Sequence, residues 1–137
     1  MSVRLARSGL LALATIVLAM ACGRAGRCGT CGMKVDPASA WVSYLTVNGQ
    51  EVAFDTPRCA LAAWRGSGKI SGARFREYYS QELISADRIR FVAGSDVIGP
   101  MGPELVPVGL DNAARFARDH NGAPPKTAEE ALQEAAP

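Results

Sequence analysis

The chain has 137 residues, a length that fits one domain and is too short for a large multidomain enzyme. Fifteen Lys and Arg residues against thirteen Asp and Glu residues give a formal net charge of +2. Two of those basic residues lie in the first 21 positions, so the rest of the chain is close to neutral. The sequence also has no basic stripe with interleaved aromatic residues, and this excludes the usual kind of nucleic-acid-binding protein.

Residues 1–21 predict a lipoprotein signal peptide. Two arginines precede an apolar run at residues 9–19, which is too short to span a bilayer comfortably. The sequence LAMAC that ends at Cys22 resembles a bacterial lipobox, in which the cysteine is acylated by fatty acids such as palmitate and becomes the new N-terminus. Several acyl chains would give durable membrane attachment. Gly23, the residue after the cysteine, resembles the signal that sorts lipoproteins to the outer membrane of a Gram-negative cell. An ordinary cleaved signal peptide or an uncleaved anchor are the alternatives.

Three cysteines are left once Cys22 is assigned to lipid: Cys28, Cys31 and Cys59. An exported protein meets an oxidising compartment, where thiols tend to pair. Three thiols cannot all pair within one chain. At least one of them is therefore free, bound to a metal or shared with another molecule.

Residues 22–40 are rich in Gly, Ser, Ala and Pro, and predict an irregular tether that carries a Cys/Met motif to a folded domain at residues 41–122. The domain starts with a predicted hairpin. Residues 41–47 are β-branched and aromatic, Asn-Gly at 48–49 is the strongest short hairpin signal, and residues 51–54 return as the partner strand.

A helix is predicted after this hairpin. Asp55 or Thr56 provides the N-cap, Pro57 suits the first turn, and Gly66 marks the end of the helix. A further strand is expected at residues 73–79.

The second half of the domain repeats this layout at an offset of 54 residues. Strands are predicted at residues 88–93 and 104–108, and a helix at residues 110–120. The prediction is an α+β fold made of two small β-β-α-β units packed together. Residues 123–137 predict a polar C-terminal tail with a short solvated helix instead of a final strand, so the second unit is expected to be truncated.

The pair Cys28-Gly-Thr-Cys31 leaves two kinds of site open. A thioredoxin-type redox pair starts a helix whose dipole lowers the thiol pKa, but Gly32 and Pro37 prevent a helix directly after Cys31. A zinc ribbon requires a second pair of ligands, and its sequence signature is absent here because only Cys59 and His120 remain as strong candidates.

Two methionines favour a softer metal. A thioether is a poor ligand for Zn(II) and a good one for Cu(I), so Met33, two residues after Cys31, indicates a soft-metal site. Met101 lies in Gly-Pro-Met-Gly-Pro, a tight loop that presents its side chain. The alternatives are that Met33 fills a gap in the core and that Met101 is a hydrophobic plug at a turn.

At this point the order of motifs resembles the NosL family, copper-binding lipoproteins that serve nitrous oxide reductase maturation. The resemblance covers most of residues 28–122. It rests on Cys-Gly-Met-x-Val at 31–35, Trp41, Phe-Asp-x-Pro-x-Cys at 54–59, Tyr-Tyr at 78–79, Pro-Met-Gly at 100–102, Ala113 to Phe116 and His-x-Gly at 120–122.

The resemblance implies a periplasm-facing, membrane-tethered Cu(I) metallochaperone with no enzymatic activity, related in fold to organomercurial lyase. It would pass copper to the membrane-associated proteins that mature nitrous oxide reductase. Cys31 and Met33 match the family's metal-binding motif, Met101 matches its loop methionine, and His120 matches a histidine near the end of the last helix. Cys28 is an additional thiol that could form a disulfide with Cys31 in the metal-free protein.

Two other functions stay open. The first is an exported thiol-disulfide oxidoreductase that uses Cys28 and Cys31. The second is an organomercurial-lyase-like enzyme, which requires two cooperating thiols and a nearby carboxylate. Asp55 and Cys59 are available for the second function, but nothing in the sequence places the Cys-x-x-Cys pair beside them. As a residue of the first predicted helix, Cys59 is most simply a small buried hydrophobic side chain.

Overall fold

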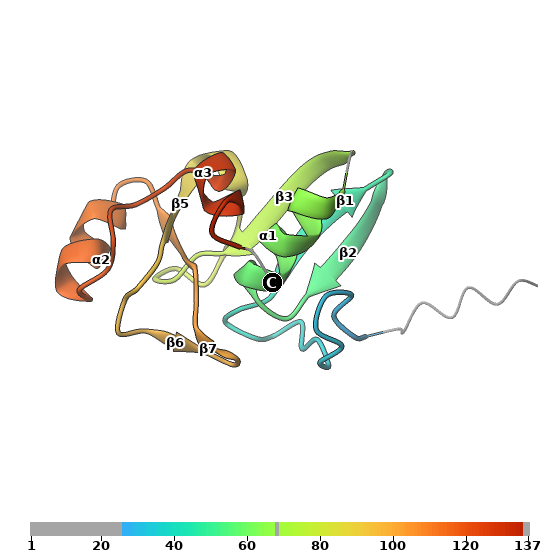
Figure 1. Cartoon of the computed structure of the whole chain (residues 1–137), viewed down its shortest axis with the longest axis horizontal. Coiled ribbons are helices and arrows are strands. Elements are labelled where there is room, and N and C mark those ends of the chain that lie inside the picture. The colour runs from blue at the N-terminus through green and yellow to red at the C-terminus, as the bar shows by residue number, and fades with distance from the viewer. Residues whose placement is uncertain (1–25, 68, 136–137) are drawn as a thin grey trace, which may run out of the picture.

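A computed structural model describes residues 26–67 and 69–135 of the chain (Figure 1). Its elements are β1 (Ser43–Val47), β2 (Gln50–Phe54), α1 (Pro57–Gly66), β3 (Ile70–Arg76), β4 (Leu83–Ser85), the 3-10 turn η1 (Ala86–Arg88), β5 (Ile89–Val92), β6 (Ile98–Gly99), β7 (Gly102–Pro103), β8 (Val106–Gly109), α2 (Ala113–Asp119) and α3 (Ala128–Leu132). This mixture of small sheets and short helices confirms the predicted α+β class.

The first unit is an antiparallel sheet in the order β2-β1-β3-β4, against which α1 packs (Figure 1). The turn between β1 and β2 places Asn48 at φ 49° and Gly49 at φ 77°, the left-handed pair that a two-residue hairpin turn requires. The predicted hairpin is therefore confirmed. Leu45 and Phe75 extend from the sheet into a core where neither side chain is exposed to solvent.

The predicted start of α1 is also confirmed. The side chain of Thr56 accepts a hydrogen bond from the backbone N–H of Cys59, and Pro57 occupies the first turn. Such a cap satisfies one of the backbone donors that a helix leaves unpaired at its N-terminus. It also fixes where the first turn of α1 lies relative to the sheet.

The second unit is complete, contrary to the expected truncation. β5 pairs with β8, and residues 123–126 run along the other edge of β5. There Phe91 and Lys126 exchange two backbone hydrogen bonds of 2.8 and 2.9 Å. This segment occupies the place beside β5 that β3 occupies beside β1. The two prolines in the segment have no N–H to donate, which leaves too few bonds for a regular strand.

The C-terminal residues differ from the predicted polar tail, because they pack into the first core. α3 begins with a capping box between Thr127 and Glu130. Ala128, Ala131 and Ala135 are buried among the residues around α1. Ala128 and Ala131 lie three positions apart on one face of α3, and Ala135 follows the helix; these small side chains allow α3 to approach α1 closely. The longest described helix, α1, has ten residues, so no described helix could cross a bilayer.

A buried carboxylate fixes the junction between the two units. Glu77 follows β3 and is 3% exposed. It accepts hydrogen bonds from the backbone N–H groups of Tyr79 (2.9 Å), Ser80 (2.6 Å) and Gly109 (3.0 Å). Burial alone would raise the pKa of Glu77, but the hydrogen bonds from Ser80, Gly109 and Tyr79 outweigh that effect and lower it.

We expect Glu77→Gln to lower the free energy of unfolding by about 1–3 kcal/mol at neutral pH, because the charged hydrogen bonds are lost from a buried position. A carboxyl group whose pKa is lower in the folded state stabilises the protein above its unfolded pKa and loses that contribution as the pH falls through its folded pKa. The deficit should therefore shrink in acid. Denaturant titrations at several pH values measure it, with the exposed Glu82→Gln as a control expected to be near neutral. An equal deficit at neutral and acid pH would contradict the assignment.

Candidate metal centre

The segment predicted as an irregular tether is an ordered turn over residues 26–35. The backbone N–H of Cys28 donates to the carbonyl of Met33 (2.8 Å), and that of Gly32 donates to the carbonyl of Cys28 (2.9 Å). Gly32 adopts φ 77°, a left-handed conformation that glycine adopts without strain. The turn buries Cys28 and leaves Cys31 half-buried at its edge.

The first turn of α1 lies against this loop. The Thr30 hydroxyl donates to the carbonyl oxygen of Cys59 (2.9 Å) and so joins the loop to the helix. Asp55 follows the last residue of β2 and directly precedes the helix cap. Since β2, α1 and the loop meet here, residues about 25 to 30 positions apart in sequence become neighbours.

Four potential metal ligands gather at this junction: Cys28, Cys31, Asp55 and Cys59. One ligand atom from each lies within 4.8 Å of all the others. The Cys31 thiol donates to the Asp55 carboxylate, with Sγ 3.2 Å from Oδ1 and 3.3 Å from Oδ2. Cys28, Asp55 and Cys59 are only 2%, 5% and 5% exposed, and all three thiols are free. We call these four residues the Cys3Asp cluster.

The surroundings of Cys31 and Cys59 favour the protonated forms of these two thiols. Burial raises the pKa of the Cys31 thiol, and its hydrogen bond to Asp55 adds to the increase, while a bond from the backbone of Met33 opposes it. Burial likewise raises the pKa of Cys59 well above its usual range, although Thr56 opposes this. A metal that binds as a thiolate complex must therefore displace protons. The low dielectric of the site strengthens the attraction of a cation once the thiolates form.

Met101 reaches the same place from the second unit. It lies at the tip of the two-residue loop between β6 and β7 and is 56% exposed. A cavity of about 290 Å³ separates its loop from the cluster. The cavity is lined by Thr30, Cys31, Thr56, Arg58, Cys59, Ala62, Met101, Pro103, Glu104 and Ala135. A soft thioether thus faces the same space as two of the thiols.

Cys31 also borders a second cavity, of about 590 Å³, between residues 26–32 and β2. Its lining also includes Cys28, and the half-buried Cys31 is a lining residue of both cavities. Met33 lines neither cavity, and its side chain is 40% exposed.

His120 lies at the end of α2 in the second unit. Its Nδ1 is 2.8 Å from Asp96 Oδ1, and its ring stacks on Phe116 with centroids 4.4 Å apart. It is not one of the four residues of the Cys3Asp cluster. The assignments of Met33 and His120 as ligands stay predictions, and Cys22 lies outside the described residues.

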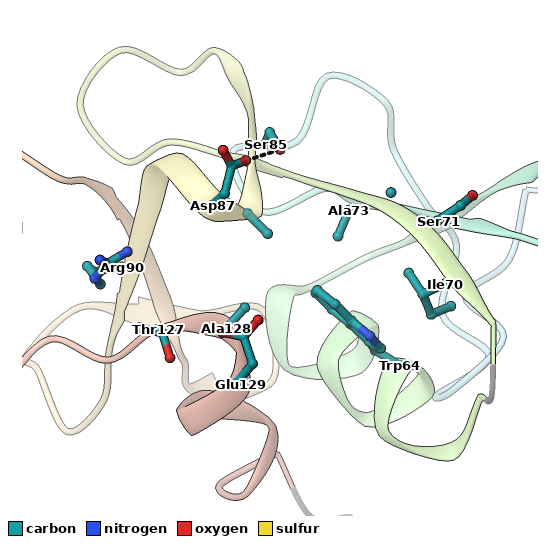
Figure 2. A pocket seen from close by; sticks show the side chains of 12 residues that line it. Trp64, Ile70, Ser71, Ala73, Ser85, Asp87, Arg90, Thr127, Ala128 and Glu129 are labelled. Atoms are coloured by element: carbon teal, nitrogen blue, oxygen red, sulfur yellow. Dashed lines mark hydrogen bonds between the residues drawn. The ribbon is translucent and has the colours of Figure 1, made fainter.

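Figure 2 shows another cavity, of about 400 Å³, bounded by β3, α1, η1 and the start of α3. Trp64 and Ile70 form its apolar side, and Arg90 and Glu129 lie toward its polar side. None of the residues that line it carries a sulfur atom. Its chemistry therefore does not suit a soft metal, and the candidate metal site is the cluster of thiols.

Sequence reasoning missed Asp55 and Cys59 as members of the site. Cys59 is buried, as predicted, but its sulfur lies within 4.8 Å of the other three donor atoms and is not simply a hydrophobic contact. One signal was available, since Asp55 and Cys59 flank the same predicted helix cap. The redox interpretation loses support, because Cys28 and Cys31 occupy a turn and neither starts a helix.

Comparison with curated proteins and with solved structures gave no match. The family model described as NosL matches residues 19–133, which include the Cys3Asp cluster, the loop of Met101 and both units of the fold. Family membership and the cluster together fit a copper-binding role. The match covers most of the chain, which therefore belongs to the NosL family.

Proposed function

We propose that this protein is a membrane-tethered Cu(I) metallochaperone that delivers copper for the maturation of nitrous oxide reductase. The observation that carries the proposal is the meeting of three free thiols within 4.8 Å, with Met101 on the same cavity. Thiolate and thioether sulfur are the protein ligands that Cu(I) prefers. Copper is the cargo of such a site, so the site has to release the ion as well as bind it.

Cys31 is the proposed central ligand, supported by its position between the buried thiols and the two cavities. Cys59 and Met101 provide further sulfur donors from either side of the smaller cavity. A Cu(I) ion with two or three ligands leaves room for a ligand from the recipient protein, so copper passes by exchange without being free in solution. Met33, which lies two residues after Cys31 and is exposed, is the proposed additional thioether on the solvent side.

Cys22 is the proposed site of lipid attachment, which would hold the protein on the periplasmic side of the outer membrane. The recipients of copper are proposed to be the maturation proteins of nitrous oxide reductase. In a nitrous-oxide-reducing host that lacks this gene, we expect nitrous oxide reductase to accumulate with a reduced copper content. Metal analysis of the purified reductase checks this, and full copper loading without the gene would contradict the assigned client.

The role of the methionines is tested by anaerobic Cu(I) titration of the reduced protein. We expect one tightly bound Cu(I) per chain, and a roughly tenfold loss of affinity for Met101→Ala, because one soft donor is removed. Met33→Ala should also weaken binding. Ile98→Ala, which changes another exposed side chain of the β6–β7 hairpin, should leave the affinity unchanged. Equal affinities for Met101→Ala and Ile98→Ala would exclude Met101 as a ligand.

One observation favours a second candidate function, cleavage of a carbon–mercury bond. The thiols of Cys31 and Cys59 and the carboxylate of Asp55 lie together, as that chemistry requires. Two thiols bind mercury as a dithiolate, one of their two protons passes through Asp55 to the carbon, and the alkane leaves; the other proton leaves with the displaced anion. Release of alkane from an alkylmercury salt, abolished in Asp55→Asn, would establish this activity. No release with the reduced protein would exclude it.

A further inference from the structure

Positive charge is concentrated next to the proposed lipid anchor. Residues 22–35 contain three basic residues, Arg24, Arg27 and Lys34, and no acidic one, whereas residues 36–137 contain ten basic and thirteen acidic residues. The short segment therefore carries a charge of +3, and the rest of the mature chain carries −3. A charge asymmetry of this kind indicates a surface that binds an anionic partner.

Arg27 and Lys34 face each other across the turn of residues 26–35. They form an isolated antiparallel bridge, flanked on either side by a backbone hydrogen bond of 2.8 Å. This is the pattern of a non-hydrogen-bonded pair, in which opposite side chains lie close together on one face. Both side chains are exposed, and within the described residues neither forms an ion pair. Because like charges in this position repel, the pair favours an external anion.

The proposed anchor keeps this cation pair close to a bilayer. Four peptide units connect Cys22 to Gly26, the first described residue, and a chain of that length spans at most about 14 Å. The Debye length at physiological salt is about 8 Å, so charges on the lipid headgroups act over much of that distance. Arg27, the next residue, can therefore reach the headgroups of the membrane that holds the anchor.

From these observations we infer that the turn of residues 26–35 is a second membrane contact, at which Arg27 and Lys34 bind anionic phospholipid headgroups. The inference takes its setting from the proposed membrane attachment and goes beyond copper delivery, because it assigns a separate surface and ligand. A basic patch strengthens the membrane binding that acyl chains provide. An anchor limits only the distance from the bilayer, whereas this contact also fixes which side of the domain faces it.

Exposed apolar side chains lie on the same side of the molecule. Met33, which directly precedes Lys34, is 40% exposed. In Figure 1 the turn (blue) and the β6–β7 hairpin lie along the same lower edge, and one cavity borders both. That hairpin carries Ile98 and Met101, which are also exposed. Surfaces that combine basic and apolar side chains suit the interfacial region of a bilayer. The contact thus turns the cavity between Cys31 and Met101 toward the membrane.

The test uses the mature chain from residue 22 with Cys22→Ser, so that no acyl chain attaches it to lipid. Both described cores are built from residues 28–135, so this chain retains them. Reduced and metal-free, it should cosediment with phosphatidylcholine vesicles that contain about one third phosphatidylglycerol, and not with pure phosphatidylcholine. Binding should fall steeply between about 0.05 and 0.5 M NaCl, because salt screens the charges.

Arg27→Gln combined with Lys34→Gln should weaken binding to the anionic vesicles by at least about tenfold, since each basic residue near such a surface contributes about fivefold. Arg65→Gln combined with Lys69→Gln is the matched control. It removes the same charge from exposed residues at and beyond the far end of α1, and should change binding by less than about twofold. Arg27→Lys keeps the charge but alters the hydrogen bond to the carbonyl of Gly32, and should bind as the wild type does.

Equal binding to the two kinds of vesicle, or equal losses in the two double variants, would overturn the inference. Absence of binding to any vesicle would overturn it as well and would leave this face to a protein partner. If Arg27→Lys binds as weakly as the double glutamine variant, the conformation of the turn and not its charge is responsible, and the inference fails. Normal Cu(I) binding without vesicle binding refutes this inference alone, whereas vesicle binding without Cu(I) binding supports it and refutes the copper proposal.

Discussion

Cys31→Ser should lower the Cu(I) affinity of the protein by at least about a hundredfold, or about 2.7 kcal/mol of binding free energy. Serine replaces a soft thiolate with a neutral hydroxyl, which is a poor Cu(I) ligand. The exchange changes the size of the side chain little, and Cys31 is only half-buried, so the fold should persist. Anaerobic competition with a Cu(I)-specific chelator measures the affinity.

Cys59→Ser is the informative comparison for that experiment. If Cys59 were only a small buried hydrophobic residue, serine in its place would reduce stability and leave copper binding intact. We expect a loss of copper affinity as well, smaller than for Cys31→Ser, because Cys31 lies at both cavities and Cys59 at one. Unchanged Cu(I) affinity in Cys31→Ser would show that the site is wrongly assigned.

Gly122→Ala should destabilise the second unit by about 1–3 kcal/mol through overpacking. A Cβ atom at this position would lie closer to Cγ1 of the buried Val92 than two carbon atoms can approach. The backbone cannot easily move away, because the N–H of Gly122 donates to the carbonyl of Ala117 (2.8 Å) at the end of α2. Thermal or denaturant unfolding measures the loss.

Gly66→Ala is a matched control, because a Cβ atom added at the last residue of α1 meets nothing within 4 Å. In a helix, alanine is preferred over glycine by about 1 kcal/mol, so this variant should be neutral or slightly stabilised. Equal stability of the two variants would show that Val92 yields to the added methyl group. Copper stoichiometry should be unchanged in both, since neither residue lines the cavities at the cluster.

The parts of the fold that the sequence predicted correctly depend on short-range signals. Asn48 and Gly49 specify their turn by backbone conformation, and Thr56 and Pro57 specify the start of α1 by capping. The buried position of α3, in contrast, has no short-range signal in the sequence. Its alanines are weakly hydrophobic and its charges are many, so only its packing against α1 shows that it belongs to the core.

The residues of the candidate site also divide into those with a short-range sequence signal and those that only the fold brings together. Cys31 was identified from its immediate neighbours, whereas Asp55 and Cys59 lie 24 and 28 positions further along the chain and join it only through the fold. No local pattern encodes that approach, which depends on how the first loop lies over α1. Met101 was suggested by its glycine and proline neighbours, and its place on the cavity follows from the packing of the second unit.

With its second unit complete, the fold consists of two halves that share a layout but differ in their potential metal ligands. Each half has a hairpin, a helix and a returning segment, so a duplicated metal site would be possible in principle. At the offset of 54 residues, however, Asp55 corresponds to Gly109 and Cys59 to Ala113. The second half thus lacks donor atoms where the first half has them, and it contributes the methionine-bearing hairpin instead. For the proposed copper function we therefore expect a single site per chain, with the loop of Met101 facing it from the second half.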